Sequence, residues 1–140
     1  IADVKLEIGA TATAFEFRAY EEELALCQRY TYNLKPDVAA GALAFGQCHS
    51  TTAMEGIVNF PVPMRAVPAF SSSAASTFAV WNAVAEYQTA TSIVIDLTYS
   101  SKIHANIAIG IGAANLVAGN ASMIASNNTL TSYMLFAAEL

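Results

Sequence analysis

The stretch IHANIAIGI, residues 103–111, decides the fold class of this chain. Its odd-numbered positions carry isoleucine or alanine, and the positions between them carry histidine, asparagine, alanine or glycine. Because successive side chains of a strand point to opposite faces, this period of two predicts a β-strand with one apolar face. Asn106, Asn115 and Asn120 interrupt the uncharged region around it, so there is no run of about 18 apolar residues that would suit a membrane helix.

The same period of two recurs on both sides of this stretch. Residues 91–99 alternate in the same way, and residues 4–8 form a shorter strand pattern with one charged face. Further β-prone runs cover residues 30–34, 42–49, 54–60, 78–84 and 130–138, separated by Gly, Pro, Ser and Asn. Many short strands without intervening helices predict an all-β fold, an antiparallel jelly-roll-like β-sandwich.

One segment departs from the strand pattern. Residues 21–29, EEELALCQR, are rich in helix formers, and glutamates at the start of a helix stabilise its positive end. Consecutive side chains diverge around a helix, so we interpret Glu21, Glu22 and Glu23 as a solvated cap rather than a cation site. We therefore expect one short helix near residues 21–29, within a β-sandwich domain of residues 21–140. Residues 1–20 would form an N-terminal strand and linker segment.

Composition narrows the function classes. The 140 residues are 55% hydrophobic and only 12% charged, which excludes intrinsic disorder and suits one domain. A net charge of -5 gives no basic surface for nucleic acid or for anionic lipid. Most of the charge lies within the first 37 residues, so Ser, Thr and Asn solvate the rest. Such a surface is typical of a particle subunit or an obligate oligomer, with a single uncharged polar domain as the alternative.

Residues that carry chemistry are few. We interpret Cys27 and Cys48 as buried free thiols, and their pairing stays open. His49 follows Cys48, but one Cys-His pair supplies only half of a tetrahedral zinc shell. We expect His104 to be a hydrogen-bonded or surface residue. Since no GxSxG elbow or phosphate-binding glycine loop is present, we expect no enzymatic activity, no metal and no cofactor.

Two aromatic residues are candidates for glycan binding. Trp81 and Tyr87 would form a flat platform, because aromatic rings pack on the apolar faces of sugar rings. The competing interpretation, which we favour for Trp81, is a residue of the core or of a subunit interface, since large aromatics dominate both.

Three landmarks resemble a known family. The run EELALCQRY at residues 22–30 resembles the "EELALCQRYY" signature that opens a C-terminal domain of tail-fibre and other virion proteins of tailed bacteriophages. In that family an "FPxPMR" segment follows, matched here by FPVPMR at residues 60–65, and the chain commonly finishes with "AEL", as at residues 138–140. The second aromatic of the signature is Thr31 here, with Tyr32 after it. The resemblance covers residues 22–140.

The preceding segment has a resemblance of its own. Residues 4–16, VKLEIGATATAFE, are similar to the "VQLEEGxxATxFE" ending of a carbohydrate-binding-module-like sandwich that precedes this domain in longer phage proteins. An isolated strand is not stable in water. We therefore expect residues 1–20 to join a sheet of the second domain, to pair with a neighbouring subunit, or to belong to a larger chain.

The family resemblance implies a structural function without catalysis. It implies a bacteriophage virion structural protein on the exterior of the particle, a fibre or knob domain that assembles as a homotrimer. Its partners would be its own copies, other virion proteins and host surface polysaccharide, without nucleic acid or membrane insertion. The alternative is a capsid decoration (cement) protein that stabilises the head.

Overall fold

The computed structural model describes residues 17–84 and 86–138, and within these the chain forms one α-helix and nine strands. Every pair of neighbouring strands is antiparallel, which confirms the predicted all-β fold with one short helix. The elements are α1 (Tyr20–Gln28), β1 (Thr31–Leu34), β2 (Ala42–Cys48), β3 (Ala53–Asn59), β4 (Ala69–Ser72), a 3-10 turn (Ala75–Thr77), β5 (Phe78–Asn82), β6 (Glu86–Asp96), β7 (His104–Ile111), β8 (Ala121–Ser126) and β9 (Met134–Ala137).

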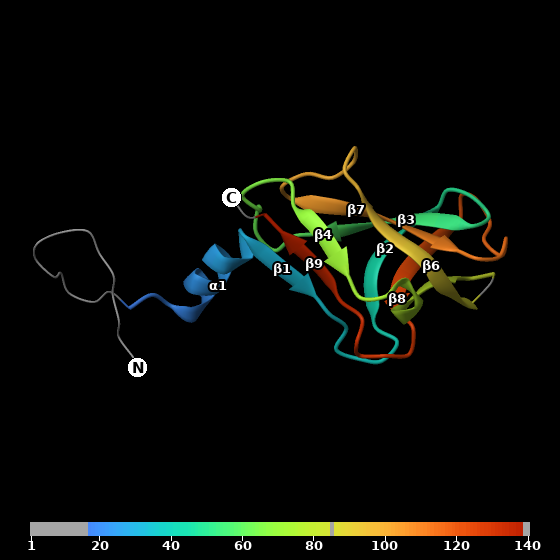
Figure 1. The fold of residues 1–140 in the computed structure, drawn as a ribbon, viewed down its shortest axis with the longest axis horizontal. Coiled ribbons are helices and arrows are strands. Elements are labelled where there is room, and N and C mark those ends of the chain that lie inside the picture. The colour runs from blue at the N-terminus through green and yellow to red at the C-terminus, as the bar shows by residue number, and fades with distance from the viewer. Residues whose placement is uncertain (1–16, 85, 139–140) are drawn as a thin grey trace, which may run out of the picture.

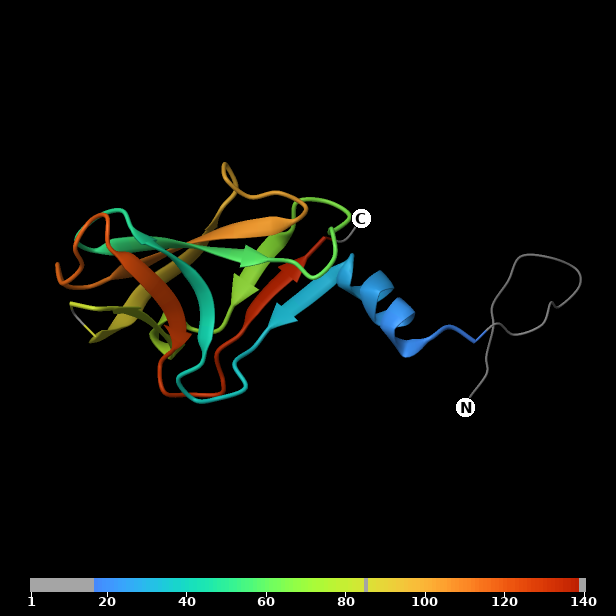
Figure 2. The ribbon, with the colours of Figure 1, turned by 180° about the vertical axis from the view of Figure 1, so that it is seen from behind.

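The strands form a barrel and a small sheet. Six strands close into a barrel in the order β2-β3-β7-β6-β5-β8, and the other three form a sheet in the order β1-β9-β4. Figures 1 and 2 show the small sheet between α1 and the barrel. The predicted sandwich-like arrangement is therefore present, with one of its layers closed on itself.

The strand predicted from IHANIAIGI lies in the barrel wall as β7. Ala105, Ile107, Ile109 and Ile111 are all buried, so the apolar face of the pattern points into the core as expected. Ile103 is 57% exposed because it precedes the first residue of the strand. β7 pairs with β3 on one side and β6 on the other, which leaves no free edge.

The long strand β6 contains an irregularity that the sequence pattern did not reveal. Its register with β7 shifts between Ala90 and Ser92. An extra residue in one strand reverses which side chains face inward. Accordingly Ala90 is buried, Thr91 is exposed, and Ile93 and Ile95 pack against the core.

Four aromatic rings connect the small sheet to the barrel. Phe136 of β9 lies at their centre, with its ring centroid 5.1 Å from that of Phe60, 5.4 Å from Phe70 and 6.3 Å from Tyr32. Phe136 is fully buried. Because Phe60 follows β3 and Tyr32 belongs to β1, this cluster holds the two sheets together.

The helix α1 lies outside the core, which corrects one prediction. None of its residues is buried, and Glu21, Glu22 and Glu23 lie in its first turn, as predicted. Cys27 is therefore exposed, contrary to our expectation of a buried thiol, whereas Cys48 is buried as expected, and both are free. The strand predicted at residues 4–8 lies outside the described residues.

Candidate functional site

A row of large side chains crosses the outer face of the barrel. Tyr87 lies opposite Trp81, Trp81 opposite Met123, Met123 opposite Phe45, and Phe45 opposite Ile57. Directly opposite residues on adjacent strands share a face of the sheet, so these five side chains are neighbours. Phe45 and Ile57 are 69% and 52% exposed, and Trp81 and Tyr87 are about two-fifths exposed.

The structure therefore brings together the two aromatics that the sequence singled out. Trp81 is an outward-facing residue between the buried Val80 and Asn82, so it does not belong to the core of this chain, and its place in a subunit interface stays a prediction. Tyr87 is held beside it, and its hydroxyl donates a hydrogen bond of 3.3 Å to the Ala40 carbonyl. The pair forms one end of the row.

A hollow of about 510 Å³ lies at the other end of the row, and we call it the Phe45 hollow. Polar groups are fixed within it: Asn106 Nδ2 donates to Glu55 Oε2 at 3.0 Å, and Glu55 Oε1 lies 3.6 Å from His49 Nδ1. The lining residues are Phe45, Gly46, Gln47, Glu55, Ile57, Tyr99 and Asn106.

A smaller hollow of about 130 Å³ continues the first one. Phe45 lines both hollows, and Trp81 and Met123 line the second. Because both hollows share the exposed Phe45 ring, they form a path over β3, β2, β8 and β5 that leads to the Trp81–Tyr87 pair. An extended ligand lying along this path would meet several flat apolar rings in succession.

A glycine shapes the floor of the Phe45 hollow. Gly46 of β2 pairs with Gly56 of β3, and a Cβ atom on Gly46 would collide with the backbone carbonyl of Glu55. The absence of a side chain therefore permits the two strands to approach closely at this point. The flanking residues Phe45 and Gln47 are exposed and face outward.

Hydrogen bonds of His104 hold the loop that carries Tyr99 to the hollow. His104 Nε2 lies 3.0 Å from the Tyr99 carbonyl, and Nδ1 lies 3.1 Å from the Ser101 hydroxyl. Since a carbonyl only accepts, Nε2–H is the donor, and in the neutral ring Nδ1 accepts from the serine hydroxyl. The expectation of a hydrogen-bonded histidine is confirmed.

The path combines the groups that recognise sugars. Exposed aromatic rings pack on apolar faces, while a carboxylate and amides exchange hydrogen bonds with hydroxyl groups. The sequence did not predict Phe45, Glu55, Tyr99 or Asn106, since these residues come from different elements and converge only in the fold. One signal was available, because Phe45 occupies an outward position in a predicted strand.

The described residues offer neither a metal site nor a membrane-spanning helix. No group of three or more His, Cys, Asp or Glu side chains in the described chain is arranged to hold a metal ion. The helix α1 is too short to cross a membrane, and no helix within residues 17–84 and 86–138 is long and apolar enough to do so. Comparisons with protein-family models, curated proteins and solved structures found no match to this chain.

Proposed function

We propose that this chain is a structural protein of a tailed-bacteriophage virion, a fibre or knob domain that assembles as a homotrimer and contacts host surface glycans. The assignment to a virion rests on the resemblance at residues 22–30, 60–65 and 138–140. The same resemblance implies a position on the exterior of the particle, where the protein would act by assembly and display.

The geometry supports treating these three landmarks as one unit. The Arg65 backbone N–H donates to the Arg29 carbonyl at 2.8 Å, and the Ala138 N–H donates to the Tyr30 carbonyl at 2.7 Å. Segments that are far apart in the sequence thus meet at the junction of α1 and β1. A signature whose parts share backbone hydrogen bonds is expected of a single folding unit.

The observation that best supports glycan binding is that the Phe45 ring lines both hollows. This ring links a hollow that contains Glu55 and Asn106 to the hollow beside Trp81. Glu55 is the one carboxylate among the described lining residues of these hollows, whereas most glycosidases use two. We therefore propose binding without hydrolysis.

Glycan binding is tested with an array of bacterial surface polysaccharides, followed by titration of the best binder. Phe45→Ala and Trp81→Ala are expected to weaken binding by about tenfold each, and Tyr87→Ala by less, because stacked rings contribute about 1–3 kcal/mol in sites of comparable chemistry. Tyr20→Ala is the matched control, since Tyr20 is 76% exposed on α1, outside the path.

The outcomes distinguish a wrong assignment of the site residues from a wrong proposal of glycan binding. If polysaccharide binds and the Trp81 and Tyr87 variants bind equally well, those two residues are not part of the site. If no polysaccharide binds the trimer, the proposed host contact fails. Release of shortened oligosaccharides would contradict the proposal that the protein lacks enzymatic activity.

Capsid decoration is the second candidate, and exposed aliphatic residues favour it. Val94 of β6, Leu97 and Ile103 are 55%, 63% and 57% exposed around the β6–β7 connection. Exposed aliphatic groups suit contact with protein better than contact with sugar. A cement protein would bind purified capsid shells and raise their melting temperature, and mass spectrometry of virions would find hundreds of copies rather than a dozen or two.

A further inference from the structure

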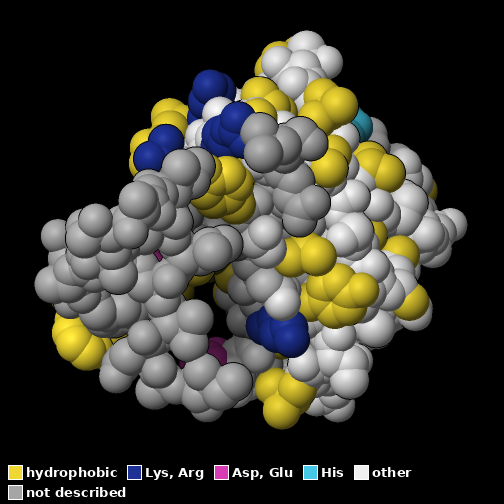
Figure 3. All heavy atoms as spheres, turned by 60° about the vertical axis from the view of Figure 1, so that its left-hand side comes forward, with side chains coloured by type: hydrophobic (Ala, Val, Ile, Leu, Met, Phe, Trp, Pro, Cys, Tyr) yellow, Lys and Arg dark blue, Asp and Glu magenta, His cyan; other side chains and the backbone are white. Residues whose placement is uncertain are grey.

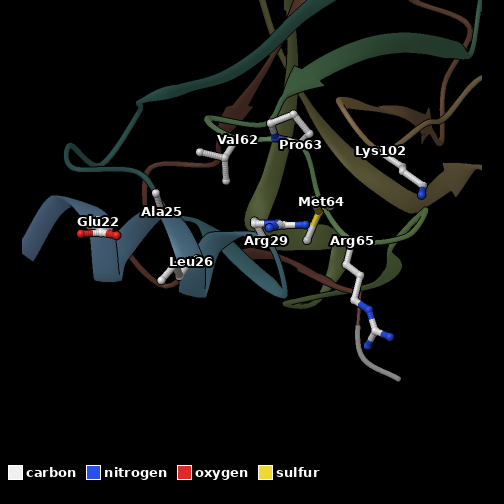
Figure 4. Close-up of a pocket in the computed structure, with 9 residues that line it drawn as sticks. All are labelled: Glu22, Ala25, Leu26, Arg29, Val62, Pro63, Met64, Arg65 and Lys102. Atoms are coloured by element: carbon white, nitrogen blue, oxygen red, sulfur yellow. The ribbon is translucent and has the colours of Figure 1, made fainter. Parts of the chain in front are cut away.

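A pocket separate from both hollows of the aromatic path lies between α1 and the segment that follows β3. Its volume is about 560 Å³. Figure 4 shows that α1 supplies one side and residues 62–65 the other. Its described lining consists of Glu22, Ala25, Leu26, Arg29, Val62, Pro63, Met64, Arg65 and Lys102. We call this the α1 pocket.

Cations gather at this pocket in a protein that has few of them. The described chain contains five Lys and Arg residues, and three of these, Arg29, Arg65 and Lys102, line the α1 pocket. No carboxylate of the described residues lies within salt-bridge distance of these three, whereas Arg18 pairs with Glu23 at 3.0 Å. Figure 3 shows Lys and Arg side chains beside hydrophobic side chains on the face that carries α1.

Backbone hydrogen bonds join the three segments that carry these cations. The Met64 N–H donates to the Lys102 carbonyl at 2.7 Å, and the Arg65 N–H donates to the Arg29 carbonyl at 2.8 Å. The Arg65 guanidinium also lies 5.9 Å from the centroid of the Tyr30 ring, within cation–π range. Three of the five cations of the described residues thus line one pocket of a protein of net charge -5, which favours a negatively charged occupant.

The lining distinguishes between classes of anion. Between the cations it is aliphatic, with Leu26, Val62 and Met64, and it includes no aromatic ring or side-chain amide from the described residues. The Phe45 hollow has both of these groups, which sugars need for stacking and for hydroxyl recognition. An aliphatic floor with a cationic rim instead matches a side chain such as leucine next to a carboxylate.

We infer that the α1 pocket binds a short acidic peptide segment of a protein partner, one that carries an aliphatic side chain beside a carboxylate. The aliphatic side chain would fill the space between α1 and Pro63, and the carboxylate would lie among Arg29, Arg65 and Lys102. This site goes beyond the proposed glycan contact and does not depend on it, because it shares no described residue with the aromatic path.

The probe is an mRNA-displayed library of random dodecapeptides, selected in parallel on the intact protein and on a variant with Arg29→Gln, Arg65→Gln and Lys102→Gln. The intact protein is expected to enrich peptides that have Glu or Asp next to an aliphatic residue, and the triple variant is not. Lys35→Gln is the matched control, since Lys35 is an exposed cation outside the pocket.

The affinity of the best enriched peptide for single variants of the protein is expected to decrease in one case and to increase in another. Arg65→Gln is expected to weaken binding about threefold or more, and Glu22→Gln to strengthen it, because Glu22 is the one acidic residue in the described lining. Lys35→Gln should leave the affinity unchanged. Binding should fall as salt is raised, since exposed charges are screened.

Three results would overturn this inference. The first is the absence of acidic-aliphatic enrichment on the intact protein. The second is equal enrichment on the triple variant, once circular dichroism shows that both are folded. The third is binding of oligogalacturonate in place of the peptide, which would assign the pocket to an acidic sugar.

Discussion

Gly46 is the residue at which local backbone geometry and the candidate glycan site meet. Its Cα faces Gly56 across the β2–β3 ladder, and the space that a side chain would need is occupied by the Glu55 backbone. A flexible side chain could move away, but a paired strand cannot do so without losing hydrogen bonds. The position therefore requires glycine for reasons of space rather than of backbone dihedral angle.

Gly46→Ala is expected to destabilise the protein by about 2 kcal/mol or more, because the methyl group forces β2 and β3 apart. Glycan affinity should fall as well, since Phe45 and Glu55 flank the distorted pair. The free energy of unfolding from urea denaturation is the measurement. Gly112→Ala is the control, because its Cβ would make only an ordinary contact with Thr91, and a loss of similar size there would contradict the argument.

Single residues also show what the sequence could and could not predict about the site. The pattern marked Trp81 and Tyr87 as possible partners, and the register places them directly opposite each other. It did not indicate Glu55 or Asn106, whose contact spans 51 positions of the chain. Such contacts depend on strand order, which alternation does not encode.

Among the elements, β8 shows why one strand of the barrel wall was missed. It lies between β2 and β5 and buries Ile124, yet Ser122 and Ser126 also point inward. Their hydroxyls are satisfied within the fold, by Met54 Sδ at 3.4 Å and by the Ala39 carbonyl at 2.9 Å. A polar residue that is bonded internally can occupy a core position, so the apolar period is lost from the sequence.

The small sheet depends on one side chain more than on its hydrogen-bond ladders. Each of its three strands has only four residues, and the central β9 inserts Phe136 among Tyr32, Phe60 and Phe70. A short sheet of this kind is not independently stable without an apolar face to pack on. Phe136 provides that contact with the barrel.

Phe136→Ala is therefore expected to cost about 3–5 kcal/mol, because it removes a fully buried ring and leaves a cavity between two sheets. Thermal unfolding followed by circular dichroism would show the loss. Phe45→Ala removes the same ring from an exposed position, 69% accessible, and should change stability by less than about 0.5 kcal/mol. Equal effects of the two substitutions would mean that the aromatic cluster does not connect the layers.

At the scale of the whole molecule, closure of the barrel can be followed by combining the registers of its six strand pairs. Starting at Tyr87 and stepping from partner to partner through β5, β8, β2, β3 and β7 leads back to β6 at Asp96. The strands are therefore staggered around the barrel, as closure requires. The sequence predicted seven of the nine described strands, because alternation is a local pattern, but stagger is a property of all six barrel strands together.

Closure limits how the barrel can associate with copies of the molecule, whereas the small sheet keeps β1 and β4 as its outer strands. The strands of a closed barrel have no free edges, so its contacts must use side chains on the outer face. The exposed aliphatic residues Val94, Leu97 and Ile103 lie together in sequence around the β6–β7 connection. In the proposed homotrimer we expect these three residues to be covered by a neighbouring protomer, which would leave the Trp81–Tyr87 end of the aromatic path open for glycan.

Leu97→Glu is expected to weaken trimer formation at least about tenfold, because a carboxylate without a partner would be buried in each of the three contacts. Val38→Glu introduces the same charge at a position that is 58% exposed and remote from the β6–β7 connection, so it should leave the oligomer intact. Light scattering over a dilution series measures both variants against the parent protein. A parent that scatters as a monomer at every concentration would refute the trimer itself, whereas a trimer that tolerates Leu97→Glu would place the protomer contact on another face.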